Sequence, residues 1–340
     1  MQKTYREAIR DAMSEEMRAD KAVFLLGEEV ADYQGSYKCS VGMVQEFGPQ
    51  RVIDTPIAEC GFTGIAVGAA MAGLRPIVEY MTWNFAMLAT DHIINSAAKT
   101  HYMSGGKVSC PIVFRGLNGV AAHVAAQHSQ DYANWYMGIP GLKVVAPSDA
   151  ADAKGLLKAA IRDNAPVVVL EHEVLYGLSC EVPEGDYVTE IGKARVDIYG
   201  DGDPTSPDGL RRAGAQVTLI AYSMMAVKAR AAAEALAAEG IACEVVDLRS
   251  LRPLDVEAIA ASVSRTHKAV VLEETWAAAG VGAEVMAVIS DSCWDELDAP
   301  VVRMSQKPVP LPYAKNLEML CVPQVEDIVG EVKRVVGGER

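Results

Sequence analysis

The sequence lacks any pair of cysteines at the spacing of a disulfide framework or a zinc site. Its seven cysteines are odd in number, include no C-x-x-C pair and lie far apart, at Cys39, Cys60, Cys110, Cys180, Cys243, Cys293 and Cys321. Scattered single cysteines of this kind are typical of proteins from a reducing compartment. We therefore expect neither structural disulfides nor a zinc site.

Clusters of basic residues and long apolar runs are also missing. The formal net charge is −14, which argues against nucleic acid and anionic membrane surfaces as partners. No window approaches eighteen uninterrupted apolar residues, and the stretch Met1–Tyr5 has no apolar signal core. The sequence thus predicts a cytoplasmic protein that does not associate with membranes.

Several phosphate and metal motifs are absent or incomplete. There is no G-x-x-x-x-G-K-[ST] run and no H-E-x-x-H run. The run Gly200–Asp203 (G-D-G-D) begins like the metal-diphosphate motif of thiamine-diphosphate enzymes. No Asn follows within thirty-odd residues to complete the ligand set, so we interpret the run as a solvated turn. At Gly280–Glu284, Val285 stands where a dinucleotide fingerprint needs its third glycine, which predicts packing at a helix start instead.

What the sequence does contain is an alternation of short apolar runs and helical periodicity, which predicts an α/β fold. Residues 1–182 are expected to form a doubly wound domain, with strands at Ala22–Leu26, Arg75–Met81, Pro111–Arg115, Leu142–Ala146 and Pro166–Leu170, and helices at residues 4–19, Thr63–Ala72, Phe85–Lys99 and Asp149–Arg162. Thr4 with Glu7 suits a capping box, and Asp149 suits an N-cap. Residues 32–50 are expected to be irregular, with one short helix.

A second domain follows a polar segment rich in Pro, Gly and Asp. Residues 183–212 are predicted to be a linker, and residues 213–340 a smaller α/β domain. Its strands are expected at Gln216–Tyr222, Ala242–Asp247, Ala269–Glu273 and Pro300–Met304, and its helices at Ser223–Glu239, Asp255–Ser264, Gly280–Ser290 and Gln324–Val336.

One carboxylate stands out. Glu59 lies in the otherwise uncharged run Ile57–Gly68, at a junction between a loop and a Gly- and Ala-rich helix. A charge with little around it to solvate it suits acid–base chemistry. The alternative is an ordinary first-turn acid stabilised by the helix dipole.

The long segment between Arg115 and Pro140 carries two histidines, His123 and His128, with little periodicity. Loops of this length in compact domains are usually functional. Together with Glu59 and the aromatic Phe85, an imidazole would suit a flat heterocyclic cofactor. Taken singly, each residue also has a structural explanation, His128 in a polar loop and Phe85 in a core.

Several stretches resemble the beta subunits of the first, decarboxylating component of 2-oxoacid dehydrogenase complexes, with the pyruvate dehydrogenase branch nearest. They are I-A-E-C-G-F-T-G-I-A-V-G at residues 57–68, A-A-Q-H-S-Q-D-Y at 125–132, P-V-V-V-L-E-H-E at 166–173 and P-Y-A-K-N-L-E at 312–318, and the similarity extends over essentially the whole chain.

The resemblance implies a transketolase-type pyrimidine-binding domain followed by a transketolase C-terminal domain, paired with an alpha subunit in an α2β2 heterotetramer. The alpha subunit would supply the Mg²⁺ and diphosphate sites of thiamine diphosphate, and this chain would hold the aminopyrimidine ring. The implied activity is decarboxylation of pyruvate with reductive acetylation of the lipoyl group of the acyltransferase component. Acetoin and branched-chain 2-oxoacid dehydrogenases share much of the pattern, and a non-catalytic assembly subunit is a further alternative.

The same resemblance assigns roles to residues. Glu59 would hydrogen-bond the pyrimidine ring nitrogen and drive its amino-to-imino tautomerisation, Phe85 would stack on the ring, and Met81 and Ile57 would line its pocket. His128 would face the substrate or the lipoyl group. Family members also bind a structural K⁺, mainly through backbone oxygens at positions matching Ile112, Ala160, Ile161, Asp163 and Ala165.

The chain departs from the family pattern at three places. Ala58 and Cys60 flank the glutamate in an unexpected context, which would tune the pocket without abolishing it. About ten extra residues around Asp201–Gly209 suit a surface insertion. His172 stands where Asn is typical, and its role cannot be assigned from the sequence.

Overall fold

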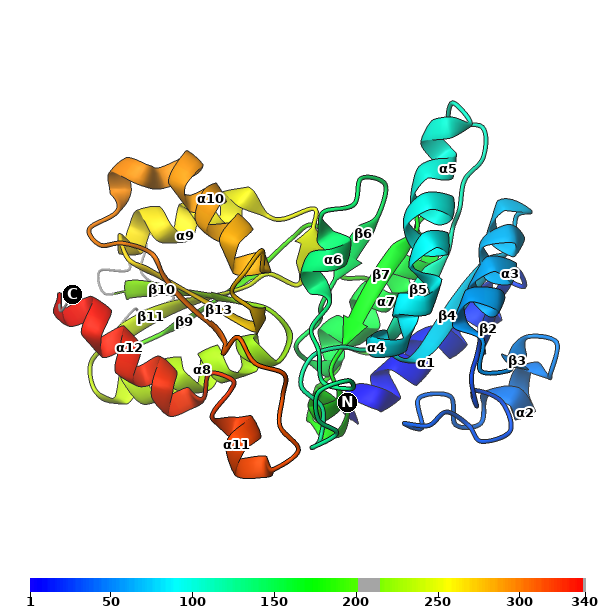
Figure 1. The fold of residues 1–340 in the computed structure, drawn as a ribbon, viewed down its shortest axis with the longest axis horizontal. Helices are drawn as coiled ribbons and strands as arrows, with labels where there is room; N and C mark the ends of the chain where they lie inside the picture. Colours follow the sequence, from blue (N-terminus) through cyan, green and yellow to red (C-terminus); the bar gives the residue numbers. More distant parts are fainter. Residues whose placement is uncertain (201–214, 339–340) are drawn as a thin grey trace. The chain divides into compact units, whose positions relative to one another are not determined.

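A computed structural model describes residues 1–200 and 215–338 of the chain (Figure 1). The predicted insertion at Asp201–Gly209 lies outside the described residues. The chain divides into two compact units: the first comprises residues 1–122, 127–191 and 250–253, and the second comprises residues 123–126, 192–249 and the rest of the chain from 254. Within the described part, no helix is long and apolar enough to cross a membrane.

The first unit is built on a seven-stranded sheet with the strand order β12-β6-β7-β5-β4-β2-β3. The strands are β2 (Val23–Gly27), β3 (Val52–Asp54), β4 (Arg75–Thr82), β5 (Val113–Leu117), β6 (Lys143–Val145), β7 (Val167–Glu171) and β12 (Ser250–Arg252). All neighbours are parallel except β12, which runs antiparallel to β6. Strands β5 and β7 are buried along their whole length, as runs without polar alternation predict. The α/β fold predicted from the sequence is confirmed.

Helices and short elements complete this unit. They are α1 (Tyr5–Ala19), α2 (Met43–Phe47), α3 (Glu59–Met71), α4 (Trp83–Ala86), α5 (Ala98–Met103), α6 (Ala133–Met137) and α7 (Ala150–Arg162), a small sheet of β1 (Gln2–Thr4) and β8 (Ser179–Glu181), and the short helix η3 (Glu173–Gly177). Thr4 and Glu7 form the predicted capping box at α1, and Asp149 caps α7 through the amide of Asp152.

The single helix predicted over Phe85–Lys99 is wrong. The segment changes from α4 through the 3₁₀ turn η1 (Met87–Ala89) to the π-helix η2 (His92–Ala97) before α5 begins. The ring of His92 packs over Gly64 of α3, and a Cβ at Gly64 would lie 3.0 Å from His92 Nε2. A side chain at position 64 would therefore press against His92, whereas Gly68 has open space in front of it.

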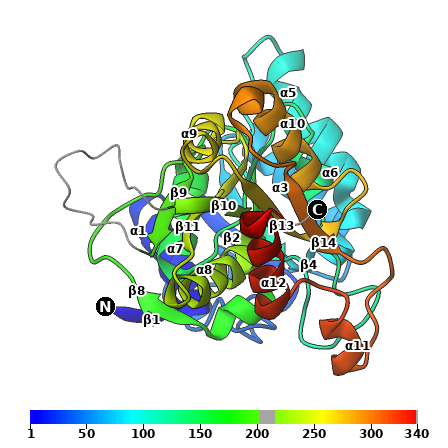
Figure 2. The ribbon, with the colours of Figure 1, turned by 90° about the vertical axis from the view of Figure 1, so that its left-hand side faces the viewer.

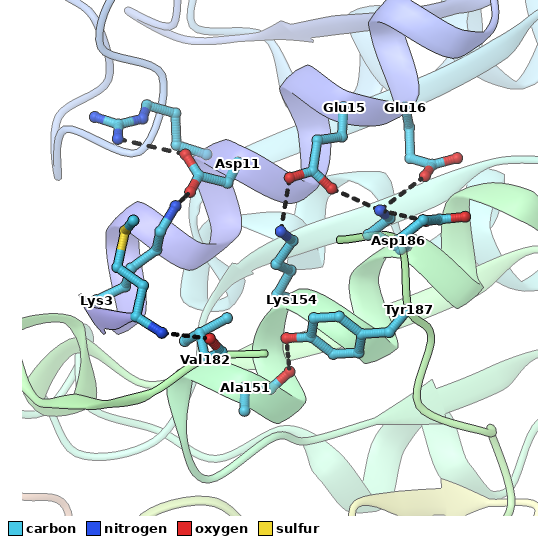
Figure 3. Close-up of polar contacts among 12 residues, drawn as sticks. Lys3, Asp11, Glu15, Glu16, Ala151, Lys154, Val182, Asp186 and Tyr187 are labelled. Atoms are coloured by element: carbon cyan, nitrogen blue, oxygen red, sulfur yellow. Dashed lines mark hydrogen bonds and ion pairs between the residues drawn. The ribbon is translucent and has the colours of Figure 1, made fainter. Parts of the chain in front are cut away.

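Ion pairs hold α1 against α7 (Figure 3). Glu15 accepts hydrogen bonds from Lys154 and Lys158, both at 2.6 Å, and Figure 3 shows Lys154 below Glu15. Glu16 accepts two hydrogen bonds from Arg162, at 2.9 and 2.7 Å. The side chain of Lys158 is almost completely buried, so its ammonium group depends on the neighbouring carboxylates for compensation of its lost hydration.

The second unit contains a five-stranded sheet with the order β14-β13-β10-β11-β9, in which only β9 is antiparallel to its neighbour. The strands are β9 (Arg195–Tyr199), β10 (Ala215–Ala221), β11 (Ala242–Asp247), β13 (Ala269–Trp276) and β14 (Val302–Gln306), and the helices are α8 (Ser223–Ala238), α9 (Val256–Thr266), α10 (Val281–Cys293), η4 (Trp294–Glu296), α11 (Lys315–Met319) and α12 (Val325–Gly337). Figures 1 and 2 show α8 and α12 on one face of this sheet and α9 and α10 on the other.

Strand β9 lies in the segment that the sequence predicts as a linker. It is the edge strand of the sheet and pairs with β11. Every residue of β9 is half-buried, so the strand has no continuous apolar run that would reveal it in the sequence. The segment predicted as a linker therefore contains an edge strand of the second sheet, and residues from 192 onward belong to the second compact unit.

Packing at the start of α10 is confirmed. The backbone amide of Gly282 donates to Glu273 Oε2 at 2.7 Å, and a Cβ at Gly280 or Gly282 would lie within 3 Å of the Glu273 carboxylate. Because a side chain of this chain already occupies the helix N-terminus, the glycines serve close approach and not a dinucleotide phosphate.

Candidate functional site

The predicted site residues lie in loops that follow neighbouring parallel strands of the first unit. Glu59 begins α3 after β3, Phe85 lies in α4 after β4, and His128 lies in the loop after β5. Parallel strands bring their carboxyl ends to the same edge of a sheet, which is where α/β proteins bind ligands. The topology therefore gathers three loops that are far apart in sequence.

Glu59 is a buried carboxylate, with 3% of its surface exposed. It is the first residue of α3, whose N-cap Ala58 has no capping side chain. A hydrogen bond of 2.8 Å between Thr63 Oγ1 and Tyr80 OH fixes the first turns of α3 against β4. Burial raises the pKa of Tyr80, and the charge of Glu59 adds to the shift. The helix dipole explains a charge at this position, but it does not explain why the charge is buried.

Glu28, which sequence reasoning missed, faces Glu59. It follows β2 directly, is 5% exposed, and its Oε1 has no hydrogen-bond partner among the described residues. Burial raises the pKa of Glu28 to about 7, and the charge of Glu59 and a hydrogen bond to it add to the shift. Near neutral pH the Glu28 carboxyl is therefore still partly protonated beside Glu59. The sequence signal was an acid placed directly after a buried strand.

Phe85 and His128 lie together. Their ring centroids are 5.2 Å apart, with the rings nearly perpendicular. Asn84 Oδ1 accepts hydrogen bonds from the backbone and side chain of Gln130, at 3.3 and 3.1 Å, and so ties the start of α4 to the residues after His128. Asn84 and Gln130 are positioning groups that the sequence analysis did not identify.

The loop that carries His128 is closed at its base. Asn118 Nδ2 donates to Asp131 Oδ1 at 2.7 Å, the amide of Tyr132 donates to Asn118 Oδ1 at 2.8 Å, and the amide of Gly119 donates to the carbonyl of Gln130 at 3.0 Å. These bonds define a loop over residues 118–132. Its two ends are held rigidly at the sheet edge.

The other two residues predicted to line the pocket are less enclosed. Met81 lies on β4 and is half-buried. Ile57 lies in the loop before α3 and is 83% exposed. An apolar side chain this exposed, two residues before a buried carboxylate, leaves one side of the site uncovered by the described part of this chain.

The predicted K⁺ ligands lie directly before β5 (Ile112), in the last turn of α7 (Ala160 and Ile161) and between α7 and β7 (Asp163 and Ala165). The carbonyl oxygens of Ile161 and Asp163 accept hydrogen bonds from Arg75, at 3.1 and 2.8 Å. Each carbonyl oxygen has two lone pairs, so acceptor capacity for a cation remains. No group of three or more His, Cys, Asp or Glu side chains suited to a metal ion occurs among the described residues.

His172 has a local role. Its Nδ1 accepts a hydrogen bond from the amide of Val174 at 3.3 Å, which caps the short helix η3 after β7. The residue that the sequence left unassigned is thus a helix cap.

The site fits a flat nitrogen heterocycle. A buried carboxylate at Glu59 can accept a hydrogen bond from a protonated ring nitrogen, and the unpartnered Glu28 Oε1 needs a polar neighbour that the described residues do not supply. The Phe85 ring offers an apolar face, and it follows β4, the strand beside β2, after which Glu28 lies. This donor and acceptor set is what the predicted aminopyrimidine ring requires.

Comparison with known proteins identifies the two halves of the chain. Residues 1–178 match the family described as "Transketolase, pyrimidine binding domain", and residues 209–328 match "Transketolase, C-terminal domain". Among solved structures, the "Split gene transketolase, inactive beta4 tetramer" matches with a TM-score of 0.77 and 25% identity, covering 99% of both chains.

Curated relatives match over nearly the whole chain. The pyruvate dehydrogenase E1 component subunit beta of Rickettsia bellii is 55% identical over 335 residues, which cover 98% of this chain and 99% of that protein. The subunit of the same name from Rhizobium meliloti is also 55% identical, over 98% of this chain and 69% of that protein. The mitochondrial subunit beta-2 of Oryza sativa subsp. japonica is 54% identical, over 97% of this chain and 85% of that protein.

Proposed function

The chain belongs to the transketolase-type family of pyruvate dehydrogenase E1 component beta subunits, and from that premise we propose that it works with an alpha subunit in the oxidative decarboxylation of pyruvate and the reductive acetylation of the lipoyl group of the acyltransferase component. The observation that carries the proposal is the buried pair Glu28 and Glu59 at the carboxyl end of a parallel sheet, inside a domain that matches a pyrimidine-binding family.

The buried carboxylate pair manages protons in this proposal. Glu59 holds the ring nitrogen of the pyrimidine through a charge-assisted hydrogen bond, which is strong because water is excluded. Glu28, with its pKa raised to about 7, keeps a proton close to Glu59 at neutral pH. Bound thiamine diphosphate supplies the electron sink for decarboxylation. The presence of this buried pair supports a catalytic role over a purely structural assembly role.

The pocket walls come from Phe85, Met81 and Ile57, and His128 faces the substrate or the lipoyl group. The contact between the rings of Phe85 and His128 at 5.2 Å supports placing both at the same end of the site. Asn84 and Gln130 keep that contact in place. Positioning of this kind contributes to rate because the reacting groups are held in order before the reaction.

The alpha subunit completes the site. Ile57 is exposed beside Glu59, Ile65 is exposed on α3, and the glycines Gly61 and Gly68 leave an open surface on the same helix. Apolar surface of this kind next to a cofactor site is typical of an interface. We therefore place the Mg²⁺ and diphosphate contacts with the alpha subunit in an α2β2 heterotetramer.

A structural K⁺ at the carbonyl oxygens of Ile161 and Asp163 is part of the same proposal. Arg75 already donates to both oxygens, so the ion would share acceptors with a guanidinium. Thermal unfolding of the alpha–beta complex in K⁺ and in Na⁺ at equal ionic strength tests this. A melting temperature that does not differ between the two salts contradicts a selective K⁺ site.

The proposed reaction is tested by purifying the chain with its alpha subunit and measuring thiamine-diphosphate-dependent decarboxylation with an artificial electron acceptor. Pyruvate, acetoin and branched-chain 2-oxoacids are compared at equal concentrations. The proposal predicts activity with pyruvate in the complex and none for this chain alone. Assembly without activity on pyruvate would contradict it.

A further inference from the structure

The carboxylate of Asp54 holds the loop that begins with Glu28. Asp54 is the last residue of β3, in the same compact unit as Glu28. One of its oxygens accepts a hydrogen bond from the backbone amide of Ala31 at 2.7 Å, and the other accepts one from the amide of Asp32 at 3.0 Å. The backbone that follows Glu28 is therefore fixed to the end of the neighbouring strand.

The residue before Glu28 is held as well. Gly27 ends β2, and its carbonyl oxygen accepts a hydrogen bond from the amide of Thr55, the residue after Asp54, at 3.0 Å. On the opposite side, a Cβ at Gly27 would lie within 3 Å of the carbonyl oxygen of Glu79 on β4, so the two strands approach too closely for a side chain there. Glu28 thus lies between two fixed stretches of backbone.

The backbone directly after Glu28 is in a conformation that side chains disfavour. Glu29 has a φ of +61°, in the left-handed region. Its carbonyl oxygen accepts a hydrogen bond from the amide of Gly35 at 2.7 Å. A strained conformation of this kind persists where surrounding contacts impose it. Because the two hydrogen bonds to Asp54 follow within three residues, they belong to the contacts that impose it.

Asp54 also begins the segment that leads to Glu59. Gly27 and Asp54 are paired in the parallel ladder of β2 and β3, and residues 55–58 then connect β3 to α3, whose first residue is Glu59. The carboxyl groups of Glu28 and Glu59 are both buried and interact through a hydrogen bond. Two short segments that start from one pair of strand ends therefore carry the two acids, and Asp54 joins these segments.

The other carboxylates beside this segment already have partners. Glu79, next to Gly27 on β4, forms an ion pair with the buried Arg115, and the oxygens of Asp54 face backbone amides. Among the described residues, burial and Glu59 account for the raised pKa of Glu28. A change in the position of Glu28 should therefore change its pKa.

We propose that Asp54 is a positioning residue that holds Glu28 against Glu59. Without its two hydrogen bonds the loop after Glu28 loosens, water reaches the Glu28 carboxyl, and the contact with Glu59 weakens. The effect on turnover rests on the proposed function, in which Glu28 keeps a proton close to Glu59. The effect on the pKa of Glu28 does not rest on it.

Two substitutions of Asp54 and one control test this role in the alpha–beta complex. Asp54→Ala removes both acceptors, whereas Asp54→Asn keeps one oxygen and places an amide donor at the other position. Asp54 is exposed, so neither variant opens a cavity in the core. Asp32→Asn is the matched control, because its side chain is exposed and its backbone amide is retained. We expect kcat for pyruvate to fall about tenfold in Asp54→Ala, by a smaller factor in Asp54→Asn, and not in Asp32→Asn. Assembly, thiamine-diphosphate binding and melting temperature are measured for each variant.

The deciding experiment titrates Glu28 in the full chain by urea unfolding. The difference in the free energy of unfolding between Glu28→Gln and its parent should rise from pH 4.5 and level off at the pKa of Glu28, about 7 in wild type. In an Asp54→Ala background it should level off about one pH unit lower, because a looser carboxyl is better hydrated. Asp32→Asn should leave this pH unchanged. The same levelling-off pH in Asp54→Ala and in wild type overturns the positioning role.

A double-mutant cycle separates this inference from the proposed function. If Asp54 acts through Glu28, Asp54→Ala lowers kcat no further in a Glu28→Gln background. An equal further loss there overturns positioning through Glu28 and leaves the proposed function intact. Full activity of Glu28→Gln, together with a lower levelling-off pH in Asp54→Ala, overturns the proton role proposed for Glu28 and supports the positioning of its carboxyl by Asp54.

Discussion

Replacing Glu28 with glutamine should stabilise the chain at neutral and alkaline pH. Glutamine has the shape and the hydrogen-bonding capacity of the protonated acid but cannot ionise. In the folded chain the Glu28 carboxyl is buried against Glu59, so its ionised form is disfavoured. The substitution therefore removes a group that becomes unfavourable as the pH rises.

The size of the effect follows from the pKa. Burial first, and the charge and hydrogen bond of Glu59 second, raise the pKa of Glu28 from 4.5 to about 7. At about 1.4 kcal/mol per unit, this shift corresponds to at most about 3 kcal/mol. Because the folded pKa lies above the unfolded value, the folded chain binds more protons between pH 4.5 and 7, and stability from this group is lost as the pH rises through that window.

Urea unfolding of wild type and Glu28→Gln at a series of pH values measures the difference. The free energy of unfolding of the variant should equal that of wild type near pH 4.5 and exceed it by up to about 3 kcal/mol above pH 7. Glu29→Gln, at the exposed neighbour, is the control and should show no such pH dependence. A wild-type-to-variant difference that stays constant from pH 4.5 to 8 would refute the inference that burial and the neighbouring Glu59 raise the pKa of Glu28 to about 7.

Two further predictions concern the framework around the site. Arg115 is buried between Glu79 and Glu171, so Arg115→Met should lower the free energy of unfolding by about 3–5 kcal/mol in urea titrations. Adding Glu79→Gln and Glu171→Gln should restore part of this loss. An Arg115→Met variant as stable as wild type would contradict a stabilising role of these two ion pairs. Gly68 has open space in front of it, whereas a Cβ at Gly64 would meet His92. Gly68→Leu should therefore change the free energy of unfolding of the isolated chain by less than about 1 kcal/mol but weaken its assembly with the alpha subunit in analytical ultracentrifugation, whereas Gly64→Leu should destabilise the isolated chain itself. Unchanged assembly of the Gly68→Leu variant would show that this face of α3 is not the interface.

The fold was predictable where the signal is local. Buried strands such as β5 and β7 appear as apolar runs, and the caps at Thr4 and Asp149 appear as residue types at fixed spacing. Strand β12 was missed because its three residues pair with β6, more than a hundred positions away, and a pattern in one stretch carries no trace of that partner. The π-helix was missed because its extra residue per turn depends on packing against α3.

Some candidate site residues can be named one by one from the sequence, but their arrangement cannot. Glu59 is distinctive as a lone charge in an apolar run, whereas Glu28 looks like an ordinary acid at a strand end. Its importance comes from a contact with Glu59 across two strands, which only the parallel topology creates. The contact of Asn84 with Gln130 likewise joins distant segments. Such contacts have no signature in the spacing of residues along the chain.

The measurement that tests the central claim most directly is turnover of the alpha–beta complex with Glu59→Gln. The variant should still bind thiamine diphosphate, because glutamine keeps the shape of the side chain, while kcat for pyruvate should fall about 10²–10³-fold, or about 3–4 kcal/mol, because the charge that meets the ring nitrogen is gone. Cofactor binding with turnover close to wild type would contradict the role of Glu59 and with it the account of this site.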